Sequence, residues 1–340
     1  MTLRDREKVR VAGLKPALFS AAACLPGVYN KIRRPFCLHE DHSDENLCPT
    51  LRQQAIRYFD ARKIGWHDGI KSPTGPERPS NHLCCSQSFC VNVWFPFIDA
   101  PLKLAAFLRD LGFDAVEALP IDLDLPLDGG QRPYVAFEWI GRQNYLRERH
   151  RGSIAPDMAR DRGKGFTSAD VIVRFRRTDG KIQIVLVEWK YTELYIDSPL
   201  QCSKSGTDRL NDIYRPELTH QGCPIRIPEG ACHSFLFFDP FDQMMRAQLL
   251  AAAMERNTEM QADVVSCLHL TPRCNAELNH SINSSGLRRL GSTIHDVWGT
   301  LVTPDRFQAR HVEDVVAAAI RHAPDPVWAS DLQQRYAGMR

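Results

Sequence analysis

Thr167–Tyr191, TSADVIVRFRRTDGKIQIVLVEWKY, carries the clearest structural signal in the sequence. Two runs rich in β-branched residues, Val171–Phe175 and Ile182–Val187, flank Thr178-Asp179-Gly180, and this arrangement predicts a β-hairpin. A three-residue loop places Gly180 in the left-handed conformation that the bulge of such a hairpin requires.

The register of this hairpin brings charged side chains together at its open end. With a three-residue loop, counting outward from the turn places Asp170 directly opposite Glu188. Side chains alternate along a strand, so Glu188 and Lys190 lie on the face that carries Asp170. A two- or four-residue loop would instead place Asp170 opposite Trp189.

Two carboxylates and one ammonium group in this arrangement favour metal-assisted hydrolysis. Paired carboxylates repel each other unless a cation lies between them, and two carboxylates with waters are typical Mg²⁺ ligands. The ion would activate a bound water and polarise a phosphoryl group, while Lys190 orients that water or offsets the developing charge. The alternative is an ordinary ion pair between Glu188 and Lys190. The position of Asp170 in register and the apolar flanking strands weigh against that alternative.

Asp170, seventeen intervening residues and Glu188-Trp189-Lys190 resemble the PD-(D/E)XK signature of restriction-endonuclease-like nucleases. Longer blocks resemble a bacterial family of restriction endonucleases; these are Ser80–Leu83, Ser86-Gln87, Cys90–Asn92, Thr167–Asp170 and Val187–Glu193. The likeness runs from about Pro35 to about Phe307. Ala169 replaces the proline of the signature, which is often absent in the superfamily.

The resemblance implies an α/β fold with a restriction-endonuclease-like core, in which a mixed β-sheet is flanked by helices, and with an N-terminal cap of helices and loops. It also implies Mg²⁺-dependent hydrolysis of DNA phosphodiester bonds in bacterial defence, with Mn²⁺ able to substitute and with 5′-phosphate and 3′-hydroxyl products. Asp170 and Glu188 would bind the metal ion, and Lys190 would position or activate the water. Many such nucleases act as homodimers that cut both strands, which is also an option here.

A third acidic candidate lies on a strand expected before the hairpin. Tyr134–Ile140 alternates well enough for a strand, and it carries Glu138 on a different face from Phe137 and Trp139. Most strand glutamates are merely solvated, but a glutamate in an aromatic strand beside an acidic hairpin is a candidate metal ligand.

Basic residues before the hairpin indicate a loop that binds a nucleic-acid backbone. The candidates for contact with DNA are Arg142, Arg162 and Lys164, together with Arg209 farther along the chain. A solvated basic loop is an equally good interpretation, and an ordinary surface role is the commoner one for Arg209. The resemblance adds Gln87 as a residue facing the active centre.

Composition places the chain among ordinary globular proteins. It has 340 residues, 43% of them apolar, and a net charge of +2, so any DNA-binding surface depends on local clustering of charge. No apolar run approaches the roughly 20 residues of a membrane span. A charged N-terminus and the mildly apolar Ala17–Leu25 suggest a signal peptide, but Pro16 and Pro26 bound that stretch and favour a cytoplasmic protein.

Eleven cysteines are an odd count that fits no secreted disulfide framework. Cys37, His39, His42 and Cys48 could supply ligands to Zn²⁺, although their spacing matches no closed structural zinc pattern. Two alternatives to a nuclease therefore stay open. One is a nuclease-fold protein that binds nucleic acid without cutting it, and the other is a structural zinc protein built on these four residues.

The remaining patterns predict a cap over residues 1–80, a nuclease core over 81–310 and a C-terminal helical tail over 311–340. The expected helices are Thr50–Asp60, Ser86–Phe97, Pro101–Leu111, Asp242–Arg256, Leu287–Leu301 and His311–His322, and the expected strands after the hairpin are Ser234–Phe238 and Asp263–Leu270. Thr50 with Gln53 has the form of a capping box, and Ser86 is a natural N-cap. His67 and Asp68 fall in a loop, where they either line a cleft or stay at the surface.

Overall fold

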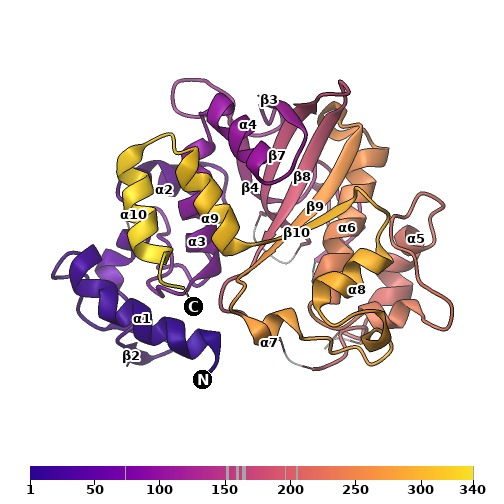
Figure 1. Ribbon diagram of the computed structural model, residues 1–340, viewed down its shortest axis with the longest axis horizontal. Helices are drawn as coiled ribbons and strands as arrows, with labels where there is room; N and C mark the ends of the chain where they lie inside the picture. Colours follow the sequence, from indigo (N-terminus) through magenta and orange to yellow (C-terminus); the bar gives the residue numbers. More distant parts are fainter. Residues whose placement is uncertain are drawn as a thin grey trace.

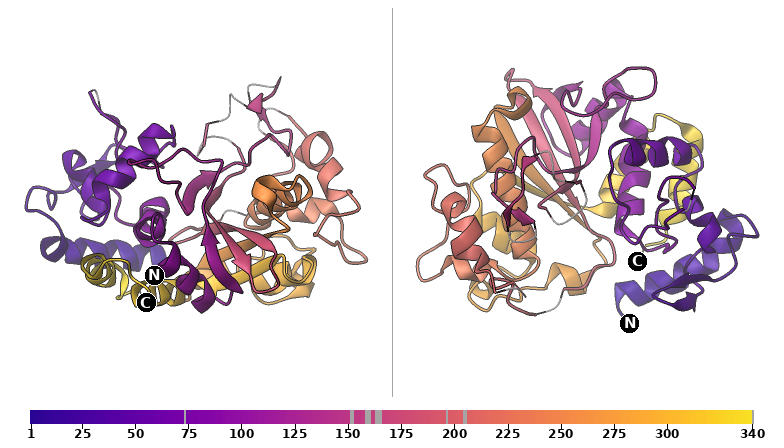
Figure 2. Two further views of the ribbon diagram at one scale, coloured as in Figure 1. Left: turned by 90° about the horizontal axis from the view of Figure 1, so that it is seen from above. Right: turned by 180° about the vertical axis from the view of Figure 1, so that it is seen from behind.

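The computed structural model describes residues 1–72, 74–150, 153–157, 161–162, 166–195, 197–203 and 206–339. Its centre is a six-stranded mixed sheet in the order β10-β9-β8-β7-β3, with β4 also pairing with β7 (Figure 1). The strands are β3 Ala115–Leu119, β4 Val135–Trp139, β7 Ala169–Arg177, β8 Ile182–Trp189, β9 Val264–Thr271 and β10 Phe307–His311. Helices cover both faces of this sheet (Figure 2), which confirms the predicted α/β fold.

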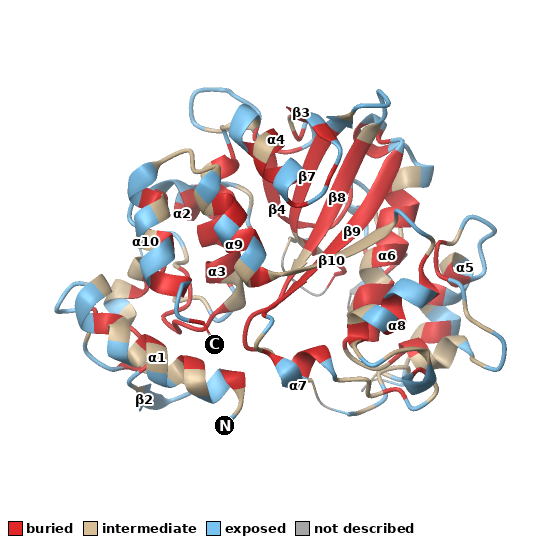
Figure 3. Cartoon of the chain, viewed as in Figure 1, coloured by how far each residue is buried: buried red, intermediate tan, exposed pale blue. Residues whose placement is uncertain are grey.

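The hairpin β7–β8 has the predicted register. Val171 pairs with Val187, and the backbone N–H of Arg177 donates to the carbonyl oxygen of Lys181 at 2.9 Å. The loop between the strands therefore has three residues, and Gly180 within it has a φ of +84°. Both strands are buried along most of their length (Figure 3), because each has a neighbour on either side and helices above and below.

One face of the sheet packs against helices from both ends of the chain. These are α1 Leu3–Leu18, α2 Arg52–Ala61, α3 Ser86–Trp94, α4 Pro101–Asp110, α9 Val312–Arg321 and α10 Pro326–Tyr336. The core on this face joins Phe59 of the N-terminal segment and Trp328 of the C-terminal segment to Phe89, Val173 and Val187. The segments 1–80, 81–310 and 311–340 thus all contribute to the core on this face.

The opposite face is covered by the segments that connect the parallel strands β8, β9 and β10. The main helix is α6, Phe241–Arg256, beside α8, Ile294–Leu301. Shorter elements complete this side, namely η4 Leu210–Tyr214, α5 Arg215–Leu218, η5 His233–Leu236, η6 Glu259–Gln261, α7 Ala276–Asn279 and η7 Arg288–Leu290. Their core includes Met245 and Trp298 against Ile172 and Leu186 of the hairpin.

The remaining elements are short and lie outside the main sheet. They are the strand pairs β1 Gly27–Tyr29 with β2 Ile32–Arg34 and β5 Arg149–His150 with β6 Ser153–Ile154, and the 3₁₀ segments η1 Glu40–Asn46 and η2 Phe95–Phe97. Within the described ranges, no helix is long and apolar enough to cross a membrane.

Two predicted elements are wrong. Ser234–Phe238 is no strand; it contains the 3₁₀ turn η5, and its apolar Leu236 and Phe237 are buried in the core beneath α6. The single helix expected over Leu287–Leu301 is divided at Gly291, where an added Cβ would lie 2.9 Å from the backbone nitrogen of Val297. The helix expected over His311–His322 is confirmed as α9, Val312–Arg321, and the strand β10, Phe307–His311, comes directly before it.

The predicted caps are also wrong. Helix α2 begins at Arg52 with Leu51 as N-cap and no side-chain cap, and α3 has Cys85 as N-cap, so Ser86 is its first helical residue. A complete capping box occurs instead at Thr293 and Asp296, where it begins α8. Tertiary packing, and not the local cap signal, sets the start of the two earlier helices.

Candidate active site

Three acidic side chains come from three neighbouring strands at one level of the sheet. Phe137 of β4 pairs with Val171 of β7, and Val171 pairs in turn with Val187 of β8. Continuing both registers by one residue places Asp170 between Glu138 and Glu188. The hairpin register alone brings Asp170 and Glu188 together, whereas Glu138 joins them through the pairing of β4 with β7.

The backbone of Glu138 has a left-handed conformation, with a φ of +49°. This conformation is uncommon for a residue other than glycine and is found preferentially at functional sites. It interrupts the alternation of β4, so Phe137 lies in one core and Trp139 in the other. The prediction that Phe137 and Trp139 share a face is therefore wrong.

Glu188 and Lys190 form a close ion pair at the end of β8. The distance from Lys190 Nζ to Glu188 Oε1 is 2.7 Å, and the backbone N–H of Lys190 donates to the carbonyl oxygen of Leu270 on β9 at 2.9 Å. Asp170 Oδ2 accepts a 2.7 Å hydrogen bond from the backbone N–H of Trp189. The carboxylate of Asp170 is thus fixed against the peptide that joins Glu188 to Trp189.

Glu138 is held by two hydrogen-bond donors. Its Oε1 accepts from Gln87 Nε2 at 2.8 Å, and its Oε2 accepts from Ser168 Oγ at 3.0 Å. Gln87 lies near the start of α3, and its own Oε1 accepts from the backbone N–H of His67 at 2.7 Å. Gln87 therefore connects the N-terminal segment to the acidic cluster.

Burial and the repulsion between the carboxylates shift the pKa values of the groups in this cluster. Burial raises the pKa of Asp170 well above its ordinary value, and the negative charges of Glu188 and Glu138 raise it further. Burial also raises the pKa of Glu138, against the opposing effect of the hydrogen bonds from Gln87 and Ser168. Burial alone would lower the pKa of Lys190, but the carboxylate of Glu188 and other nearby acidic groups hold it well above its usual range. Lys190 is accordingly an ammonium ion at neutral pH.

The acidic cluster suits a divalent cation that keeps part of its water shell. Among the described residues, no three His, Cys, Asp or Glu side chains are arranged to hold a metal ion together. The carboxylates of Asp170 and Glu188 are the type of ligand that Mg²⁺ uses, since this ion binds one or two carboxylates and completes its shell with water and phosphate oxygens. Each oxygen of Glu138 accepts one hydrogen bond and has a second lone pair, so Glu138 could supply a further ligand while Gln87 and Ser168 orient its carboxylate.

The basic residues proposed to bind DNA lie in different environments. Arg142 is exposed, and its backbone N–H donates to Glu259 Oε2 at 2.9 Å. Arg162 turns inward, where its guanidinium contacts Asp124 and the carbonyl oxygens of Phe137 and Glu138.

Two further candidates for contact with DNA complete that group. Arg209 is engaged in the protein: it forms an ion pair with Asp242 of α6 at 2.9 Å and donates to the carbonyl oxygen of Leu200 at 2.8 Å. Lys164 falls outside the described residues. Of the four basic candidates, Arg142 is the described one whose side chain is exposed.

The possible zinc ligands do not converge on a site. His39 lies near Glu40 and Asp41, while His42 lies near Glu45. Cys37 is buried, and burial raises the pKa of its thiol to about 12, which opposes the thiolate form that binds zinc. These residues are all described, and they form no group able to hold a metal ion.

The family of the chain follows from a match over nearly its whole length. A family model described as a restriction endonuclease associating with ARP matches residues 22–337. The chain belongs to this family. No curated protein and no solved structure matches the chain. Membership in the restriction endonuclease family confirms the resemblance that the Asp170 and Glu188-Trp189-Lys190 blocks indicate.

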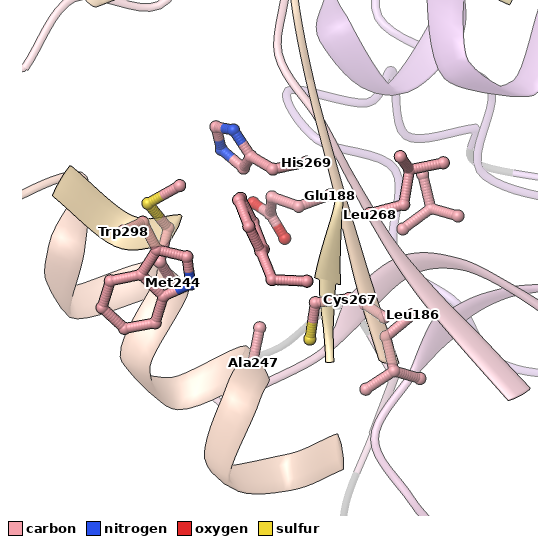
Figure 4. Close-up of a pocket in the computed structure, with 11 residues that line it drawn as sticks. Leu186, Glu188, Met244, Ala247, Cys267, Leu268, His269 and Trp298 are labelled. Carbon is pink, nitrogen blue, oxygen red and sulfur yellow. The ribbon is translucent and has the colours of Figure 1, made fainter. Parts of the chain in front are cut away.

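The family match also covers a histidine pair that sequence reasoning missed. His269 of β9 pairs with Glu188 of β8, and both line a small, mostly apolar cavity with Met244 and Trp298 (Figure 4). The Nδ1 atom of His269 lies 2.9 Å from Nε2 of His295, and burial lowers the pKa of His269 well below its ordinary value. The parallel pairing of β9 with β8 places His269 beside Glu188. No sequence motif around His269 predicts this position.

Proposed function

We propose that this chain is a Mg²⁺-dependent endonuclease that hydrolyses DNA phosphodiester bonds as a restriction-type enzyme. The observation that carries this proposal is the placement of Asp170, Glu188 and Lys190 together at the end of the central hairpin. Membership in a restriction endonuclease family supports it. Mn²⁺ would substitute for Mg²⁺, and two copies of the chain would cut the two strands.

Each side chain of the cluster has a distinct role in this proposal. Asp170 and Glu188 would hold the ion, which when bound supplies a more acidic water and offsets charge on the phosphate. Lys190 remains protonated beside Glu188, so it donates hydrogen bonds to the attacking water or to a phosphate oxygen and does not accept a proton. Gln87 and Ser168 fix the carboxylate of Glu138, which supplies further negative potential or a ligand.

The exposure of each arginine side chain determines whether we propose that it contacts the DNA backbone. Arg142 is free to meet a phosphate because its side chain is exposed next to β4. Arg162 would act indirectly, since its contacts with the carbonyl oxygens of Phe137 and Glu138 fix the end of β4. Arg209 would support α6 through Asp242.

The test is cleavage of unmethylated plasmid and genomic DNA with Mg²⁺ or Mn²⁺ by the wild type and by Lys190→Ala. Lys181→Ala is the matched control, because Lys181 is an exposed lysine next to the turn of the same hairpin. Discrete fragments from the wild type and the control, and none from Lys190→Ala, are expected. Firm binding of DNA without cleavage under either metal would refute the nuclease and favour a binding protein with a nuclease fold.

A further inference from the structure

A polar cavity of about 250 Å³ lies between the N-terminal segment and the chain that follows Lys190. Its volume corresponds to several water molecules at about 30 Å³ each, so it has room for a small organic group. The walls include Tyr29, Asp68, His82, Ser86, Thr192 and Tyr195. His67 and Asp68, which the sequence left either in a cleft or at the surface, both line this cavity.

Two of its walls are connected to the acidic cluster, one by hydrogen bonds and the other along the chain. On one side, the backbone N–H of His67 donates to Gln87 Oε1, and Gln87 Nε2 donates to Glu138 Oε1. On the other side, Thr192 follows Lys190 by two residues. The cavity wall at His67 is therefore joined to Glu138 through one side chain, that of Gln87.

The charges of the walls disfavour an anionic ligand. Arg4 contributes one positive charge, against the carboxylates of Asp68 and Glu193. His82 is uncharged at neutral pH, because burial lowers its pKa to about 4. The cavity is thus unlike a phosphate site, in which positive groups converge on the ligand.

The polar atoms of the walls suit a neutral ligand that both donates and accepts hydrogen bonds. His82 Nδ1 accepts from the backbone N–H of Cys84 at 3.0 Å, so the neutral ring carries its proton on Nε2 and donates with that atom. Ser86 also lines the cavity, but its Oγ is buried away from the open space. Asp68 accepts from Tyr29 with one carboxylate oxygen at 2.8 Å, which leaves the other oxygen as an acceptor.

Aromatic rings give the cavity flat surfaces. The rings of Tyr29 and His82 meet edge to face with centroids 4.7 Å apart. A nucleobase is planar and uncharged, and its edge carries both donors and acceptors. It is also the part of a DNA substrate that can reach a pocket beside the backbone when it leaves the stack.

We propose that this cavity receives one nucleobase turned out of the DNA duplex beside the bond that the acidic cluster cuts. In this arrangement Asp68 accepts from an amino or ring N–H group of the base, and His82 donates to one of its acceptor atoms. The inference rests on the proposed nuclease function, because that function brings DNA to the site. It adds a base-reading subsite formed by the N-terminal segment.

The test uses the full-length Lys190→Ala protein with Mg²⁺, so that DNA binding is read without cleavage. The probe is a DNA duplex carrying one mismatched 2-aminopurine, a base whose fluorescence rises when it is unstacked and whose extrusion is favoured by the mismatch. We expect a several-fold rise in fluorescence on binding. Affinity for the same duplex is measured separately by fluorescence anisotropy with a label at its end.

Two added substitutions examine the cavity itself. Asp68→Asn removes the charge and retains an oxygen for Tyr29, and asparagine tolerates the left-handed φ of +50° at this position. Ser86→Phe fills the cavity from the first turn of α3. Asp128→Asn, at an aspartate that is 84% exposed outside the cavity, is the matched control. Thermal unfolding of each variant checks that the fold is intact.

The outcomes separate this inference from the nuclease proposal. Loss of the fluorescence rise in Asp68→Asn and Ser86→Phe, with duplex affinity within about twofold and an unchanged control, supports the base subsite. A fluorescence rise by a protein whose wild type never cuts DNA supports the subsite and overturns the nuclease. Tight duplex binding with no rise, or with an equal rise in all variants, overturns the subsite and leaves the nuclease standing. A protein that binds no duplex overturns both.

Discussion

Replacing Asp170 with asparagine should stabilise the metal-free protein at neutral pH. Burial and the charges of Glu188 and Glu138 raise the pKa of Asp170 in the folded state above its unfolded value near 4. From that value upward to the folded-state pKa, the folded state binds more protons than the unfolded state, so stability falls as the pH rises. Asp170→Asn does not lose stability in this way, because asparagine does not titrate. Its oxygen can still accept the hydrogen bond from the backbone N–H of Trp189.

The same substitution should remove the stabilisation that a divalent cation gives to the wild type. An ion at one hundred times its Kd stabilises the folded state by about 2.7 kcal/mol. For 340 residues, an unfolding entropy of about 2.1 cal/mol/K per residue amounts to about 0.7 kcal/mol/K. The wild type should therefore gain about 4 °C in Tm with saturating Mg²⁺, and Asp170→Asn should gain almost nothing.

Thermal unfolding between pH 5 and 8, with and without Mg²⁺, measures both effects. The advantage of the metal-free variant should shrink as the pH falls toward 4, because the folded wild type keeps its proton and the unfolded chain, with an Asp170 pKa near 4, begins to bind one as well. Asp128→Asn, an exposed aspartate far from the hairpin in sequence, should match the wild type throughout. If metal-free Asp170→Asn were no more stable than the wild type and kept the rise with Mg²⁺, Asp170 would be neither a strained carboxylate nor a metal ligand.

Four further outcomes follow from the contacts around the cluster. Gln87→Ala should lower the rate of DNA cleavage by about 10–100-fold with little change in DNA affinity, as loss of a residue supporting a metal site does; an unchanged rate would remove Gln87 from the site. Because protons and metal compete for Asp170, raising the Mg²⁺ concentration should move the acidic limb of the pH–rate profile to lower pH, and a fixed limb would count against metal binding there. Tyr191→Phe should lower the free energy of unfolding by about 1–3 kcal/mol, because the buried carboxylate of Glu7 loses a donor; urea unfolding measures this, and equal stability would make that contact dispensable. Arg142→Ala should reduce the salt dependence of DNA binding by about one unit of slope, whereas an unchanged slope would exclude a phosphate contact.

The hairpin could be predicted because its information is local. The turn Thr178-Asp179-Gly180 fixes the loop length, and the loop length fixes which residues of the two strands face each other. Asp170 and Glu188 are thereby neighbours whatever the rest of the chain does. The apolar residues between them also predict a central position in the sheet, since such strands are buried on both faces.

The surroundings of that hairpin depend on contacts between distant segments. Gln87 and Glu138 are 51 residues apart in sequence, and they meet only because α3 packs against the hairpin. His269 reaches Glu188 through the pairing of β9 with β8. The left-handed backbone of Glu138 breaks the alternation from which its direction was predicted. Such features follow from tertiary packing, which no short window of sequence contains.

The two ends of the chain fix the strand end that carries Lys190. Tyr191 is fully buried, and its hydroxyl donates to Glu7 of α1. Arg10 donates to the same hydroxyl at 3.2 Å and to the carbonyl oxygen of Arg335 in α10 at 2.8 Å, so α1 and α10 are joined beside the site. Because Tyr191 directly follows Lys190, any shift of these helices is passed to the ammonium group through one peptide. The N-terminal and C-terminal segments therefore fix the residue next to the proposed catalytic lysine, in addition to the bonds that Lys190 itself makes with Glu188 and Leu270.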